Sequence, residues 1–125
     1  MIRRNESEED YLEAILMLKE QNGAVRSIDV AHHMDFSKPS VSRAMGILKN
    51  EGMITMDEIG QISLTPEGRK KAESIYERHK TITAFLSRTL CLDPSLTEED
   101  ACRMEHILSQ EVFEKMKEYV EKTPE

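Results

Sequence analysis

A pair of short helical stretches joined by only three residues limits the folds open to this chain. Residues 27–34 carry small and apolar side chains behind Ser27, the expected N-cap, and Asp35-Phe36-Ser37 follows as a tight connection. Ser37 caps the next helix, and Pro39 falls in its first turn, where a missing N–H costs little. The sequence therefore predicts two helices that pack against each other across a short turn.

Further elements flank this pair on both sides. An apolar stripe over residues 7–21, opened by a Ser7/Asp10 capping box, predicts a preceding helix. After the pair, two short β-capable runs at 53–56 and 61–64 surround a glycine-containing turn and predict a hairpin. Three helices followed by a hairpin is the order of a winged helix-turn-helix, so we expect a DNA-binding domain over residues 1–65.

The helix that begins at Ser37 has two different faces. Val41, Met45 and Leu48 form an inward stripe, while the outward positions near its start are polar. Short hydroxyl side chains allow close approach to a major groove, and Arg or Lys reaches phosphates or guanine edges. The net charge of −7 argues against indiscriminate DNA binding, but residues 25–56 carry four Lys or Arg against three Asp or Glu. The predicted DNA-contacting residues are Arg26, Ser37, Lys38, Pro39, Ser40, Ser42, Arg43 and Lys49.

The second half of the chain is predicted to be helical throughout. Thr65-Pro66-Glu67-Gly68 resembles a helix cap with Pro at the first position, opening a long helix to about Leu90. Thr97 with Asp100 forms another capping box, and a last helix covers roughly 110–121. The expected fold class is mainly α, with a winged helix-turn-helix followed by a helical domain over residues 66–125.

A cluster of metal-binding side chains lies in this helical half. Cys102, Glu105 and His106 are related by i, i+3 and i+4, so their side chains leave one helical face together. A thiolate, a carboxylate and an imidazole suit a divalent transition metal. Most such sites need four to six ligands, so others must come from elsewhere. The candidates are the i, i+3 pair Asp10 and Glu13 and the long-helix histidine His79.

With these motifs in place, the chain resembles the diphtheria toxin repressor and manganese transport regulator family of metal-dependent transcriptional regulators. The resemblance spans nearly all of residues 7–121 and is most specific in the segment 99–106, Glu-Asp-Ala-Cys-Arg-Met-Glu-His. It implies a homodimer that binds a palindromic operator through its N-terminal half and dimerises through its C-terminal helices. It also implies repression of metal-uptake genes when the metal is plentiful.

The same resemblance assigns a metal site but leaves the ion open. Asp10, Glu13, His79, Glu105 and His106 match the manganese-type ligand positions, whereas Cys102 matches the iron type. Carboxylates favour Mn²⁺, and a thiolate favours Fe²⁺, Co²⁺ or Zn²⁺. The expected effector is Mn²⁺ or Fe²⁺, with Zn²⁺ or Co²⁺ able to bind in vitro.

Two other functions compete with this interpretation. One is a winged-helix regulator that responds to a small organic ligand, which the metal-ligand spacing disfavours. The other is an enzyme with Cys102 as nucleophile and His106 as base, which lacks a glycine-rich elbow or oxyanion loop nearby. We therefore expect no enzymatic activity.

The location of the protein follows from features that the sequence lacks. No apolar run approaches the roughly 20 residues of a membrane span, and the N-terminus has no apolar signal segment. The two cysteines form no disulfide framework, and Cys91, between two leucines, is expected in the core. These features predict a cytoplasmic protein with no membrane partner.

Overall fold

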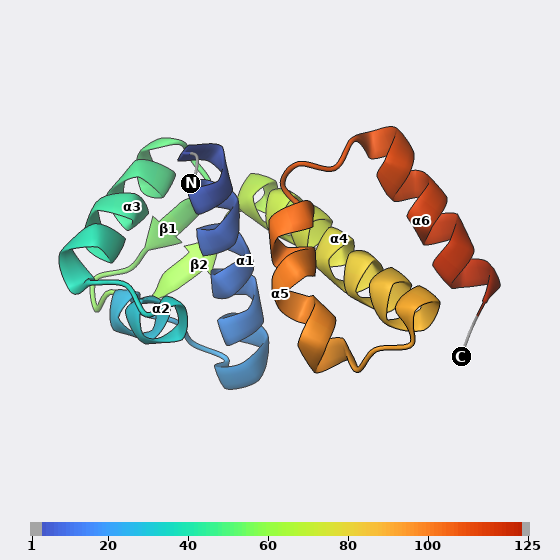
Figure 1. Ribbon diagram of the computed structural model, residues 1–125. Helices are drawn as coiled ribbons and strands as arrows, with labels where there is room; N and C mark the ends of the chain where they lie inside the picture. The colour runs from blue at the N-terminus through green and yellow to red at the C-terminus, as the bar shows by residue number, and fades with distance from the viewer. Residues whose placement is uncertain (1–3, 124–125) are drawn as a thin grey trace. The chain divides into compact units, whose positions relative to one another are not determined.

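The computed structural model describes residues 4–123 and divides into two compact units between Glu73 and Ser74. Its order is three helices, a two-stranded hairpin and three more helices (Figure 1). This order confirms the predicted fold class. The elements are α1 (Arg4–Asn22), α2 (Ser27–Met34), α3 (Lys38–Asn50), β1 (Ile54–Met56), β2 (Ile62–Leu64), α4 (Pro66–Leu90), α5 (Pro94–Met104) and α6 (Gln110–Lys122).

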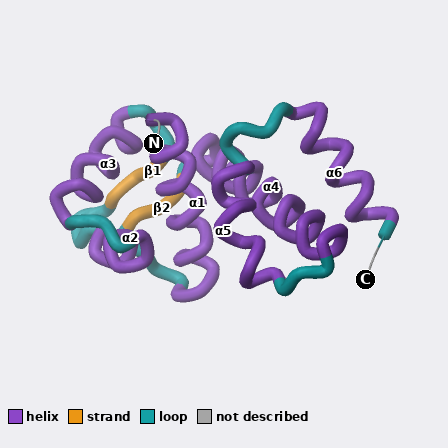
Figure 2. Tube along the Cα trace, viewed as in Figure 1, coloured by secondary structure: helices purple, strands orange, loops and turns teal. Residues whose placement is uncertain are grey.

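In the first unit, three helices surround the antiparallel hairpin, as Figure 2 shows in purple and orange. β1 and β2 pair with Thr55 opposite Ser63. The hairpin is tied back to the helices because the Ile62 N–H donates to the Val25 carbonyl at 2.7 Å, just before α2. The hairpin is thus an integral wing of the helix-turn-helix.

The cap and inner stripe of α3 follow the sequence prediction. The Ser37 hydroxyl accepts a hydrogen bond from the Ser40 N–H at 3.3 Å. Val41, Met45 and Leu48 are buried with at most 1% exposure. Burial of this stripe against the rest of the unit leaves the opposite face of α3 in solvent.

The start of α4 is locked onto the segment that leads into the hairpin. Thr65 Oγ1 accepts the Gly68 N–H at 3.0 Å and donates to the Gly52 carbonyl at 2.6 Å. Gly68 lies so close to this segment that an ideal Cβ would be 1.9 Å from the Met53 carbonyl oxygen. Only glycine therefore lets the first turn of α4 rest on this backbone.

The second unit is built from the remainder of α4 with α5 and α6. Ile82, Ala101 and Met116, one from each helix, form its buried centre. Phe85, Leu86, Met104 and Leu108 pack around them. This core is small, and several large apolar side chains of the unit remain exposed.

Three helix starts differ from the predictions. α1 begins at Arg4, so Ser7 is inside the helix. α2 is preceded by Arg26, whose N–H donates to the Asp29 carboxylate at 2.9 Å, and Ser27 is its first residue. α5 begins at Pro94 behind the cap residue Asp93, one turn before the predicted Thr97. Near the start of each of these helices, the sequence offers another possible capping residue or a Pro. Local patterns alone do not decide which of these positions begins the helix.

The capping role of Asp93 also affects its ionisation. The Ser95 N–H donates to the Asp93 carboxylate at 2.9 Å. Hydrogen bonds from the backbone and side chain of Ser95 lower the pKa of this carboxyl below its usual value. The ionised form is therefore the one that caps α5.

The expectation that Cys91 is in the core is wrong. Cys91 is exposed and has a left-handed backbone with φ of +58°. It directly follows α4, where a left-handed residue commonly ends a helix and turns the chain away. The flanking Leu90 and Leu92 are exposed too, at 57% and 42%. Within the described residues, no helix is both long and apolar enough to cross a membrane.

We expect Gly68→Ala to lower the free energy of unfolding by about 1–3 kcal/mol, the usual cost of overpacking, because the new methyl would collide with the Met53 backbone. Urea unfolding followed by circular dichroism measures this change. Gly46→Ala on α3 is the matched control, since nothing lies within 4 Å of the added Cβ, and it should be neutral or stabilising. Equal stability of Gly68→Ala and wild type would refute the close contact.

Candidate metal centre and nucleic-acid interface

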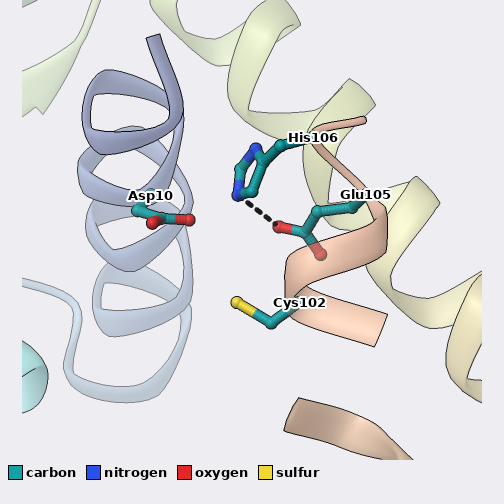
Figure 3. Close-up of side chains that lie close together, drawn as sticks. All are labelled: Asp10, Cys102, Glu105 and His106. Atoms are coloured by element: carbon teal, nitrogen blue, oxygen red, sulfur yellow. Dashed lines mark ion pairs between the residues drawn. The ribbon is translucent and has the colours of Figure 1, made fainter. Parts of the chain in front are cut away.

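Three of the predicted ligands gather at the C-terminal end of α5 (Figure 3). Cys102, Glu105 and His106 each offer one ligand atom, and these atoms lie within 4.8 Å of one another. The prediction that one helix carries all three needs correction, because α5 ends at Met104. Glu105 keeps a helical backbone as the C-cap, and His106 belongs to the following turn. The ligands therefore converge although the helix does not continue.

The Glu105 carboxylate is the centre of this cluster. One oxygen lies 2.9 Å from Nδ1 of His79, on α4, and the other lies 3.5 Å from Nε2 of His106. The Glu105 side chain is completely buried. A buried carboxylate is costly unless polar groups compensate its charge, and here an imidazole lies beside each oxygen.

His79 also faces a second carboxylate. Its Nε2 lies 4.0 Å from an oxygen of Glu98, whose side chain is 64% exposed. Each ring nitrogen of His79 therefore has a carboxylate beside it. An ionised carboxylate only accepts hydrogen bonds, so a hydrogen bond from His79 to an ionised Glu105 requires the tautomer with the ring proton on Nδ1.

This donor set fits a divalent transition metal. It combines a soft thiol with a carboxylate and imidazoles, the ligand types that Fe²⁺, Mn²⁺, Co²⁺ and Zn²⁺ accept in proteins. The carboxylate–imidazole pairs also match the arrangement in which a ligating histidine is oriented by an acidic partner.

The remaining predicted ligands, Asp10 and Glu13, belong to the first unit. Both lie on α1, one turn apart, and Figure 3 labels Asp10 on that helix. Their part in a metal site stays a prediction.

All eight predicted DNA-contacting residues are exposed in the first unit. Those at the start of α3 lie on the face opposite its buried stripe, which is the side that can meet a groove. The Ser37 and Ser40 hydroxyls are 2.9 Å apart and hydrogen-bonded to each other. Exposure makes this surface accessible to DNA, while the contacts themselves stay a prediction.

Arg26 differs from the other seven because its guanidinium is tied to the wing. Its Nη2 donates to the Ile59 carbonyl in the hairpin turn, and its backbone forms an isolated bridge with Gln61. Asp57 shapes the same turn by accepting the Gln61 N–H at 2.8 Å. Arg26 therefore holds the wing tip in place.

Sequence reasoning did not single out Arg78, which contacts the ligand-bearing turn. Its guanidinium donates to the carbonyls of Glu105 and Leu108, 27 and 30 residues away along the chain. No periodicity signals a contact at such a separation. The only available sign was an arginine directly before His79.

Comparison with known proteins gives two family matches that together cover most of the chain. Residues 5–58 match the iron dependent repressor N-terminal DNA binding domain. Residues 65–125 match the iron dependent repressor metal binding and dimerisation domain. The helices with the predicted DNA-contacting residues fall in the first of these domains, and the Cys102 cluster falls in the second.

Individual relatives agree with these matches. An HTH-type transcriptional regulator of Methanocaldococcus jannaschii is 35% identical over 94% of this chain and 95% of its own length. The transcriptional regulator MntR of Salmonella typhimurium is 36% identical over 89% of this chain and 70% of its own.

Among solved structures, the manganese regulator SloR is similar, with 28% identity and a TM-score of 0.80. The match covers 93% of this chain but only 54% of SloR, so this chain spans about half the length of that protein. The fold, both family domains and full-length relatives agree. The chain belongs to the iron-dependent repressor family of metal-dependent transcriptional regulators.

Proposed function

We propose that this protein is a repressor that binds a palindromic operator as a homodimer when loaded with Mn²⁺ or Fe²⁺, and that it controls metal-uptake genes. One observation carries the proposal: the buried Glu105 carboxylate lies between two imidazoles and beside the Cys102 thiol. The proposed role is regulation without catalysis. It suits the cytoplasm, where Cys102 stays reduced.

We propose six ligands for the metal: Asp10, Glu13, His79, Cys102, Glu105 and His106. The four ligands in the second unit include only one carboxylate, Glu105. Mn²⁺ prefers oxygen donors, so these four alone suit it poorly. The carboxylates of α1 supply two more at the i, i+3 spacing that places them on one helical face. A bound divalent cation supplies positive charge that offsets the repulsion among these acidic groups.

Ligands from both units would make the metal a link between DNA reading and dimerisation. Asp10 and Glu13 belong to the helix that packs on α2 and α3, whereas the other ligands belong to the helical unit. Shared ligation would restrict how the units move, and so the spacing of two recognition helices. Half-sites read from one DNA face are about 34 Å apart, so an ordered dimer binds with a smaller entropy cost.

The apolar surface of the second unit supports dimerisation. Six of its large hydrophobic side chains are more than 40% exposed: Leu90, Leu92, Leu96, Ile107, Val112 and Tyr119. Such side chains gain free energy when a second copy covers them. On the DNA side, the exposed Lys38, Arg43 and Lys49 bring positive charge to a protein whose net charge is −7.

We expect His106→Ala to abolish metal-stimulated DNA binding and to weaken metal affinity by more than about 100-fold, since even outer partners of ligands are worth about 10–100-fold. Anaerobic titration gives the affinity, and capture of native genomic fragments with Mn²⁺, Fe²⁺ or chelator gives DNA binding. His33→Ala, at an exposed histidine of α2, should keep wild-type metal affinity. Unchanged stimulation in His106→Ala would reject the proposed site.

The two cysteines provide an internal comparison for metal binding. Metal should slow alkylation of Cys102 and leave that of the exposed Cys91 unchanged, because only Cys102 lies within the ligand cluster. Anaerobic labelling with iodoacetamide, read by peptide mass spectrometry with and without Mn²⁺ or Co²⁺, measures both rates. Equal protection of both thiols, or protection of neither, would exclude Cys102 as a ligand.

We expect Arg43→Ala to weaken binding to the captured DNA by about 1–3 kcal/mol and to leave metal affinity unchanged, because Arg43 lies on the exposed face of α3. Fluorescence anisotropy at fixed salt measures the loss. Lys115→Ala, at an exposed lysine of α6, controls for the loss of one positive charge. A loss of metal affinity in Arg43→Ala would contradict the division of labour between the units.

A further inference from the structure

Arg78 makes an unusually complete set of contacts with the segment that joins α5 to α6. Its Nη1 donates to the carbonyls of Glu105 and Leu108, each at 2.9 Å. Its Nη2 donates to the Gln110 side chain at 3.0 Å, and its guanidinium lies 5.0 Å from the centre of the Phe113 ring. One side chain of α4 therefore holds both ends of this connection.

The contacted carbonyls lie in the connection that follows Met104, the last residue of α5. The last carbonyls of an α-helix have no partner within the helix, and α5 ends just before Glu105. An arginine is well suited to this position because its planar guanidinium presents several donors in a fixed geometry. Without Arg78, the carbonyls of Glu105 and Leu108 would each lose this hydrogen bond.

Two adjacent residues of α4 contact Glu105, one at its side chain and one at its backbone. His79 meets its carboxylate at 2.9 Å, and Arg78 meets its backbone carbonyl at 2.9 Å. Adjacent helical residues point in different directions, so the two contacts fix different parts of the same residue. His106 follows directly and has its own backbone set by the same turn.

We propose that Arg78 is a positioning residue for the metal centre. By fixing the backbone from Glu105 to Leu108, it sets the points from which the Glu105 and His106 side chains leave the chain. This inference rests on the proposed metal-binding function and deepens it. It assigns α4 two tasks, since this helix supplies the ligand His79 and also holds the turn that carries two other ligands.

Arg88 offers a matched comparison within the same unit. Its Nη1 donates to the carbonyls of Val120 and Thr123, again at 2.9 Å each. The chemistry is the same as for Arg78, but the residues held are at the end of α6 and include no predicted ligand. A comparison of variants at Arg78 and Arg88 therefore distinguishes a role in the metal centre from a general role in stability.

The experiment compares Arg78→Met with Arg88→Met in the full chain, using anaerobic titration with Mn²⁺ and the visible absorption spectrum of the Co²⁺-loaded protein. Arg78→Met should weaken metal affinity by about 10–100-fold, the usual effect of losing an outer-shell partner, and should change the Co²⁺ spectrum. Arg88→Met should keep the affinity and spectrum of the wild type, although both variants lower the thermal unfolding midpoint.

Arg78→Lys keeps the positive charge but not the planar pair of donors, and it serves if Arg78→Met does not fold. It should show a smaller loss of affinity in the same direction. Wild-type affinity and spectrum in Arg78→Met, or in Arg78→Lys alone if that is the variant that folds, would overturn the inference. An equal loss in Arg88→Met would overturn it too. Failure of the wild-type protein to bind metal would instead reject the proposed function, and that result is visible before any variant is made.

Discussion

The contact between the first turn of α4 and the Met53 backbone determines how the winged helix is closed. Thr65 caps α4 and donates to the segment after α3, while Gly68 removes the side chain that would separate the two backbones. This contact ends the DNA-binding fold and also begins the helix that carries Arg78 and His79. A glycine early in a helix is costly on propensity alone, so the close approach explains its presence.

The second unit is organised around a buried carboxylate. An imidazole lies beside each oxygen of the Glu105 carboxylate. The guanidinium of Arg78 donates a hydrogen bond to the backbone carbonyl of the same residue. Such a network is costly in a small core, because a buried polar group that loses its hydrogen-bond partner destabilises the fold. Replacing buried charged groups by apolar residues is often neutral or stabilising, so stability alone does not explain this carboxylate, and we propose that it serves a bound cation.

The mixed character of the proposed ligands bears on which ion the protein senses. Cys102 is a soft donor, whereas Glu105 and the α1 carboxylates are hard. Affinity alone would favour Zn²⁺ over Mn²⁺ or Fe²⁺ with such donors, so discrimination has to come from coordination geometry or from cellular supply. We propose that the turn held by Arg78 contributes to this coordination geometry.

The amino-acid sequence was sufficient to predict the order of elements, the buried stripe of α3, the wing and the types of candidate metal ligand. These depend on patterns within a few residues, such as the i, i+4 spacing of Val41 and Met45, which local periodicity reports directly. It placed three helix starts and Cys91 wrongly, because competing caps and the end of a helix depend on which backbone groups find partners elsewhere.

Only the tertiary structure showed that Glu105 meets His79 and that Arg78 holds the carbonyls of the same turn. The partners are 26 to 30 residues apart, on α4 and on the turn that follows α5, so no spacing along the chain encodes them. The sequence supplied the chemical groups, and the packing of α4 against α5 and the following turn decided which of them meet.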